Sequence, residues 1–134
     1  NGVEVAGDII PRLIDEIPAL AVAAAFASGE TVIRDAAELK VKESNRIAAM
    51  VNGLRAMGTD ASEQEDGLSV RGGKPLRGVR LDSHNDHRIA MALAIAGLAA
   101  AGQTIVTGEE CIPVSFPGFA ETLRSLGADA VMGV

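Results

Sequence analysis

Two long apolar runs dominate the pattern of hydrophobic and polar positions along the chain. Residues 17–28 read IPALAVAAAFAS, and residues 86–101 contain the 13-residue apolar run IAMALAIAGLAAA. Both runs are rich in Ala, which favours helix, and both are apolar on nearly all sides. We therefore expect two buried helices, which Gly29 and Gly102 bring to an end.

Two further helices are predicted from spacing and capping. In residues 44–57 the apolar side chains recur at offsets of three, four and seven from Ile47, which is typical of an amphipathic helix. Ser44 is its expected N-cap and Gly58 its expected stop. A last helix is expected over residues 117–126, with Pro in its first turn and Ser115 as its cap.

Short apolar stretches between these helices predict strands, and their order repeats. The expected strands are 31–35, 60–63, 68–71, 79–82, 104–107 and 129–132. ASGETVIRD at 27–35 parallels AAGQTIVTG at 100–108, and LRAMGTDA at 54–61 parallels LRSLGADA at 123–130. A repeat of about 70 residues is too long for a solenoid of 20–50-residue units. We expect a duplicated α/β subdomain, with copies at approximately 8–73 and 79–134.

Composition narrows the class of protein. The chain has 134 residues, a net charge of −6, no Trp or Tyr and three Phe, so it lacks the basic face and stacking aromatic residues of nucleic-acid-binding proteins. Its longest apolar run is shorter than the roughly 20 residues of a membrane span, so we expect no membrane association. A single cysteine, Cys111, fits a reducing compartment and a cytoplasmic location. The first residue is Asn1, compatible with a piece of a longer polypeptide.

A cluster of charge precedes the amphipathic helix. Residues 40–46, KVKESNR, place Lys40, Lys42, Glu43 and Arg46 at a helix start, where free N–H groups favour anions. The sequence is thus consistent with an anion site. A solvated loop that contains a Glu43–Arg46 pair is the alternative, and on the residues alone it is favoured because charge clusters at helix ends are common.

A second polar cluster, SHNDHR at residues 83–88, runs directly into an apolar helix. An arginine at this junction, Arg88, suggests an anionic ligand. The alternative is a capping cluster with Asp86 as N-cap. The pair His84 and His87 has no Cys or Glu at ligand spacing, so we expect no metal site. Cys111 has no His close in sequence and is expected to be a buried or inert thiol.

Four motifs together resemble those of the 5-enolpyruvylshikimate-3-phosphate synthase family. LKVKESNRI at 39–47 is similar to LRVKE(S/T)DR(I/L), and NDHRIAM at 85–91 to NDHRMAM. SFP at 115–117 and DEIP at 15–18 match the remaining two, in the family's order and spacing. The sister UDP-N-acetylglucosamine enolpyruvyl transferases usually have DLRAG where residues 86–90 read DHRIA, which favours the shikimate branch.

The resemblance implies a fold and a division of the active site. Family members have two domains, each of three βαβαββ units in an inside-out α/β arrangement with buried helices, and the active site lies between the domains. Residues 1–134 would then be part of the C-terminal domain, and the missing N-terminal domain would be a partner. The alternatives are a UDP-N-acetylglucosamine enolpyruvyl transferase domain and a non-catalytic anion-binding α/β module.

The resemblance also implies a reaction and its residues. The enolpyruvyl group of phosphoenolpyruvate would pass to the 5-hydroxyl of shikimate 3-phosphate, with release of phosphate and no metal or organic cofactor. Asp15 and Glu43 correspond to catalytic carboxylates. Asp15, Lys42, Arg46 and Arg88 correspond to substrate-binding residues, the two arginines on phosphoenolpyruvate.

Two positions depart from the family pattern, and one electrostatic expectation follows from the clusters. Val114 stands where many members have a Lys, and Glu38 where many have an Asn.

With the facing half of the site missing, we expect the cations at the two helix starts to repel one another for lack of counter-ions. These cations are Lys40, Lys42, Arg46 and Arg88.

Overall fold

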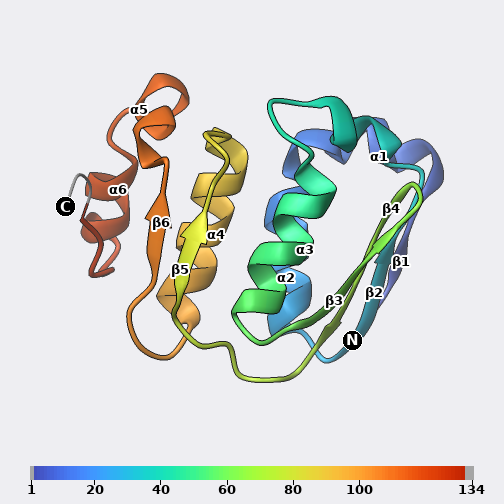
Figure 1. The fold of residues 1–134 in the computed structure, drawn as a ribbon, viewed down its shortest axis with the longest axis horizontal. Helices are drawn as coiled ribbons and strands as arrows, with labels where there is room; N and C mark the ends of the chain where they lie inside the picture. Colours follow the sequence, from blue (N-terminus) through green and yellow to red (C-terminus); the bar gives the residue numbers. More distant parts are fainter. Residues whose placement is uncertain (1, 132–134) are drawn as a thin grey trace.

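The structure of the chain is a computed structural model that describes residues 2–131. It contains a four-stranded sheet, a two-stranded sheet and a set of helices (Figure 1). The strands are β1 (Glu4–Val5), β2 (Gly29–Ile33), β3 (Asp60–Gln64), β4 (Gly67–Gly72), β5 (Arg80–Asp82) and β6 (Ile105–Thr107). The α-helices are α1 (Ile10–Leu13), α2 (Ile17–Phe26), α3 (Arg46–Ala56), α4 (His87–Ala99), α5 (Ile112–Ser115) and α6 (Phe119–Ser125). The 3-10 helices are η1 (Gly7–Ile9), η2 (Ile14–Glu16), η3 (Ala37–Val41) and η4 (Glu109–Cys111).

The four-stranded sheet has the order β1-β2-β4-β3. β1 runs parallel to β2, with Val5 beside Ile33, and the other two pairs are antiparallel. β3 and β4 form a hairpin around the acidic turn at residues 65–67. Ile33, Leu68 and Val70 are buried beneath the helices. The sheet therefore supplies one wall of the main hydrophobic core.

Helices α2, α3 and α4 lie between the four-stranded sheet and the β5–β6 pair (Figure 1). Both long Ala-rich runs are helical as predicted, and small residues let the helices approach closely. A Cβ added at Gly53 of α3 would lie 2.8 Å from a methyl group of Leu93 on α4. Burial of the two Ala-rich helices is incomplete, however: Phe26 on α2 and Ile95 on α4 are 43% and 42% exposed, because no other described element covers those faces.

β5 and β6 are parallel, with Leu81 beside Val106, and β6 packs against α4 while β5 contacts α3. α5 and α6 lie at the end of the molecule away from the four-stranded sheet (Figure 1). Phe119 and Leu123 of α6 form a second apolar cluster with Ala90 of α4 and Ile112 of α5. This smaller core fixes the C-terminal segment to the helix that carries the second polar cluster.

The structure corrects three predictions about elements: the cap of one helix, the start of another and the presence of a last strand. The N-cap of α3 is Asn45 and not Ser44: the Asn45 side chain accepts a hydrogen bond from the Ala48 N–H at 3.1 Å. The last helix begins at Phe119 after the left-handed Gly118, because Ser115 already belongs to the separate short helix α5. Residues 129–131 form no strand and have no strand partner among residues 2–131, while Met132 lies outside the described residues. No helix over the described range is both long and apolar enough to cross a membrane.

Candidate active site

Arg46 is the centre of a polar network between α3 and α4. It is the first residue of α3, and its side chain is only 2% exposed. Four of its five N–H groups point at carboxylates: Nε at Asp86, Nη1 at Asp15, and Nη2 at both Glu43 and Asp86. One Nη1 N–H is left without a partner among the described residues. The solvated-loop interpretation is therefore wrong for Arg46, although its pair with Glu43 is present at 2.6 Å.

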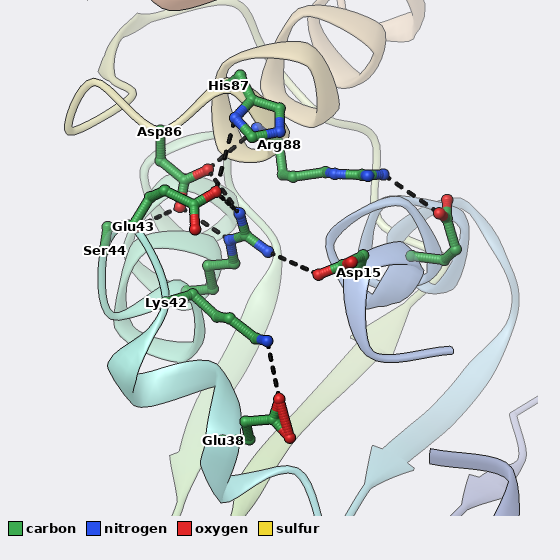
Figure 2. A network of polar contacts seen from close by, with 10 residues as sticks. Asp15, Glu38, Lys42, Glu43, Ser44, Asp86, His87 and Arg88 are labelled. Atoms are coloured by element: carbon green, nitrogen blue, oxygen red, sulfur yellow. Dashed lines mark hydrogen bonds and ion pairs between the residues drawn. The ribbon is translucent and has the colours of Figure 1, made fainter. Parts of the chain in front are cut away.

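Asp86 connects the two polar clusters. It is fully buried and acts as the N-cap of α4, as the capping interpretation of this cluster proposed, with its side chain accepting from the Arg88 N–H at 3.0 Å. The same carboxylate accepts from Arg46 Nε at 2.8 Å and Nη2 at 3.2 Å, and from Ser44 Oγ at 2.8 Å. One buried group thus holds the starts of α3 and α4 together (Figure 2).

The turn before Asp86 aims it at Arg46. His84 and Asn85 both adopt left-handed backbone, with φ of 56° and 55°. Asn and His are among the residues that tolerate this conformation best. The His84 N–H donates to Asp82 at 2.7 Å, and the Asp86 N–H donates to the carbonyl of Ser83 at 3.1 Å. The polar run in the sequence is therefore a tight turn that reverses the chain between β5 and α4.

The pKa of each member of the buried pair departs from its ordinary value. Burial by itself would raise the pKa of Asp86, but hydrogen bonds from Arg46 and Ser44 and the positive charge of Arg46 outweigh it, and the pKa is lowered. Burial would likewise lower the pKa of Arg46, and the surrounding carboxylates raise it instead. Both groups are therefore charged at neutral pH.

The two expected catalytic carboxylates flank the Arg46 guanidinium. Asp15, in η2, accepts from Nη1 at 3.2 Å, and Glu43 accepts from Nη2 at 2.6 Å. Both side chains remain about half exposed, at 51% and 52%, so they can reach a ligand from this position. The aspartates that precede the two Ala-rich helices, Asp15 and Asp86, thus converge on one arginine (Figure 2).

The remaining expected binding residues, Lys42 and Arg88, lie at the edge of this network. Lys42 Nζ donates to Glu38 at 2.8 Å, and this hydrogen bond is the first cause of a raised Lys42 pKa. Arg88 Nη1 donates to Glu16 at 3.2 Å. Figure 2 shows Lys42 and Arg88 extending from opposite sides of the network, toward Glu38 and toward the segment that carries Asp15.

The expected repulsion among cations without counter-ions is wrong. Lys42, Arg46 and Arg88 each bind at least one carboxylate, and Lys40 Nζ instead donates to the carbonyl of Glu65 at 2.6 Å. Acidic side chains from four different segments supply the missing negative charge. The sequence pattern could not reveal this pairing, because Glu16 and Arg88 are 72 positions apart.

Three other candidates are placed away from the network or take a minor part in it. His84 is 49% exposed, and its Nδ1 lies 3.7 Å from Asp82 Oδ2. His87 Nδ1 lies 3.7 Å from Glu43 Oε2, so the two histidines contact different carboxylates and do not converge. Glu43, Asp86 and His87 offer ligand atoms within 4.8 Å of one another, but Arg46 already donates to both carboxylates. Val114 is 86% exposed on α5.

Cys111 fits its expected inert character. The thiol donates to the carbonyl of Gly108 at 3.0 Å, and burial raises its pKa.

Sequence reasoning missed two residues that the network uses. Ser44 was expected to cap α3, but it bonds to Asp86, and Glu16 carried no expected role. Glu16 lies in the DEIP motif, which was the available signal.

Comparison with solved structures defines the class of protein. The structure of EPSP synthase from Acinetobacter baumannii matches with a TM-score of 0.89 and 45% identity, covering 93% of this chain and 30% of that one. The enolpyruvyl transferase NikO from Streptomyces tendae matches with a TM-score of 0.71 and 31% identity, covering 86% of this chain and 25% of that one. The chain has the mixed α/β fold of an enolpyruvyl transferase segment.

Sequence comparison then defines the family. The family model described as EPSP synthase (3-phosphoshikimate 1-carboxyvinyltransferase) matches residues 1–123. The 3-phosphoshikimate 1-carboxyvinyltransferases of Pelotomaculum thermopropionicum and Desulforamulus reducens are 63% and 60% identical, over 128 and 126 residues. These matches cover 96% and 94% of this chain but 30% and 29% of the relatives. The chain belongs to the EPSP synthase family and spans about three tenths of the length of these relatives.

Proposed function

We propose that this chain supplies one side of an active site that transfers the enolpyruvyl group from phosphoenolpyruvate to the 5-hydroxyl of shikimate 3-phosphate. The observation that carries the proposal is that Asp15 and Glu43 meet on Arg46, near the starts of α2 and α3. Lys42 and Arg88 lie at the edge of the same network and pair with Glu38 and Glu16. Family membership supports the same reaction and favours it over the UDP-N-acetylglucosamine branch.

The reaction requires two proton transfers and charge stabilisation. The 5-hydroxyl loses its proton as its oxygen bonds to C2 of phosphoenolpyruvate, and C3 gains a proton, which gives a tetrahedral ketal. Loss of a C3 proton and of phosphate then restores the double bond. Asp15 is the proposed partner of the hydroxyl and Glu43 the proposed partner of C3, because both are accessible carboxylates beside one guanidinium.

The cations have distinct proposed tasks. Arg46 is held rigidly by Asp86, so its positive charge has a fixed position before any ligand arrives, as electrostatic catalysis requires. Arg88 can turn its planar guanidinium to the carboxylate or phosphate of phosphoenolpyruvate. Lys42 is the proposed contact to the 5-hydroxyl. These roles need no metal or organic cofactor.

We further propose that the chain comprises two βαβαββ-type units of a C-terminal domain, at approximately 8–73 and 79–134. The element order supports two units of this type: β1-α2-β2-α3-β3-β4 is followed by β5-α4-β6 and a last helix, α6. Because β1 (Glu4–Val5) lies before residue 8, the first unit begins a few residues earlier than the sequence repeat indicated. The partner is then the N-terminal domain of the same enzyme, and the expected location is the cytoplasm. A non-catalytic anion-binding module is the alternative that activity measurements must exclude.

An assay of phosphate release tests the reaction. The chain is joined to the remaining residues of the Pelotomaculum thermopropionicum relative, and release of phosphate is followed with both substrates and with each one omitted. We expect release only when both substrates are present. Release with phosphoenolpyruvate alone, or none at all from a folded hybrid, would contradict the proposal.

Two neighbouring lysines provide a matched control. Lys42→Gln should reduce turnover strongly, because its ammonium is proposed to contact the substrate. Lys40→Gln, two positions away, should leave turnover within about two-fold of the parent, because Lys40 donates to a backbone carbonyl at the β3–β4 turn. Equal effects of both substitutions would show that only the net charge of this segment matters.

A further inference from the structure

Two cations of the candidate site are held by exposed glutamates. Lys42 is paired with Glu38 at 2.8 Å and Arg88 with Glu16 at 3.2 Å, and the two glutamate side chains are 60% and 64% exposed. The contrast with Asp86 is sharp, because that carboxylate is fully buried and makes four hydrogen bonds. The site therefore has one fixed carboxylate and two that can leave without exposing a buried charge.

Ion pairs that water reaches are weak, and here both glutamates are more than half exposed, while the Lys42 and Arg88 side chains are 23% and 35% exposed. Water and dissolved ions screen them, and holding two long side chains in one geometry costs conformational entropy. An arriving phosphate carries more negative charge and more acceptor oxygens than the carboxylate that it would replace. Such a ligand can displace Glu38 from Lys42 and Glu16 from Arg88.

We propose that Glu38 and Glu16 are built-in competitors that occupy Lys42 and Arg88, so that any anionic ligand must displace a glutamate to reach either cation. This inference rests on the proposed function only in taking Lys42 and Arg88 as ligand-binding residues. Neither glutamate has an expected role in the reaction. The two residues would therefore set how tightly this site holds anions.

The expected change in anion affinity follows from the fraction of protein in which Lys42 or Arg88 is not paired with its glutamate. The apparent dissociation constant equals the intrinsic value divided by the fraction of protein in which the cation is free. For the strength of typical exposed pairs, removing one competitor should tighten anion binding about two- to six-fold. Removing both should tighten it further for a ligand that contacts both cations.

Inorganic phosphate is the probe for this test. Phosphate is titrated into the 134-residue chain while the backbone amide shifts of residues 42 and 88 are followed by NMR. Glu38→Gln and Glu16→Gln should each lower the dissociation constant about two- to six-fold. Glu30→Gln removes a similar exposed glutamate, paired with Arg71 on the four-stranded sheet, and should leave phosphate binding unchanged.

A shorter carboxylate separates direct competition from a general charge effect. Glu38→Asp keeps the negative charge but is one methylene too short to keep the contact with Lys42, so it should also tighten phosphate binding. If Glu38→Asp binds phosphate like the parent while Glu38→Gln binds it more tightly, long-range charge is responsible and the proposal is overturned. Unchanged binding in both glutamine variants, or no phosphate binding in any protein, overturns it as well.

The inference and the proposed function can fail separately. A hybrid enzyme that releases phosphate, together with glutamine variants that gain no affinity, refutes the competitor role alone. Glutamine variants that bind phosphate more tightly, together with an inactive but folded hybrid, support the competitor role and refute the reaction.

Discussion

Replacing Asp86 by Asn tests whether the buried pair with Arg46 holds α3 and α4 together. Asn has nearly the same shape, and it caps helices as well as Asp does, so the cap on α4 is retained. The substitution removes the negative charge, and with the capping oxygen Oδ1 retained it also places an NH2 donor where Oδ2 accepts from Arg46 Nε and the Ser44 hydroxyl. Arg46, which is 2% exposed, then has Glu43 and Asp15 as its remaining ionic partners.

The magnitude follows from these contacts. Breaking a buried ion pair from one side usually costs about 3–5 kcal/mol. Two half-exposed carboxylates remain on the guanidinium, so we expect Asp86→Asn to lower the free energy of unfolding by about 2–3 kcal/mol at pH 7. Asp86→Ala also loses the cap and should lose about 1 kcal/mol more.

The dependence on pH provides a second, independent readout. Because the native pKa of Asp86 lies below its ordinary value, its charge stabilises the native state above the ordinary Asp pKa of about 4. This stabilisation is lost as the pH falls through the native pKa, where protonation removes the same charge as the mutation. The difference between parent and Asp86→Asn should therefore be constant from pH 5 to pH 8 and shrink in acid.

Urea unfolding followed by circular dichroism measures both quantities. A loss of 2–3 kcal/mol corresponds to a fall of about 1 M or more in the unfolding midpoint. A loss below about 1 kcal/mol at pH 7 would refute the reasoning, because the retained carboxylates would then satisfy Arg46 without Asp86. A difference that stays constant from pH 5 to pH 2.5 would mean that the charge of Asp86 is not the cause.

Three further predictions concern the reaction and the packing. In the hybrid enzyme, Asp15→Asn should lower turnover by about 10²–10⁴-fold. Phosphoenolpyruvate affinity should change little, because the amide oxygen can still accept from Arg46. Activity within a few-fold of the parent would refute the catalytic role of Asp15. Arg88→Lys should raise the KM for phosphoenolpyruvate, because an ammonium cannot reproduce a bidentate fork, and an unchanged KM would count against that contact. Gly97→Ala should destabilise the chain by about 1–2 kcal/mol in urea unfolding, because the new Cβ would lie 2.7 Å from Cβ of Thr104; increased stability, as helix propensity alone predicts, would contradict this.

Local sequence patterns predicted the helices better than they predicted the ends of elements. The Ala-rich runs and the spacing from Ile47 identified α2, α3 and α4, because helix formation depends on side chains three or four positions apart. The Asp86 cap was one of the two interpretations that the sequence left open, and it could be proposed because a cap acts within one turn. The strand expected at 129–132 could not be decided from local sequence, because a strand needs a hydrogen-bonded neighbour elsewhere in the chain. None of the described strands lies beside residues 129–131.

The sequence by itself also determined which residues are candidates for the chemistry, because three of the four motifs place charged side chains at helix starts, where anions bind. Only the tertiary structure decided how these charges are shared. Arg46 meets Asp15 and Asp86 across 31 and 40 positions, and Arg88 meets Glu16 across 72. Such pairs form because packing of α2, α3 and α4 brings their N-terminal ends together, and no periodicity along the chain records that arrangement. The same packing buried Arg46 among carboxylates and left Lys42 and Arg88 at the edge, which separates the fixed cation from the two whose counter-ions can be displaced.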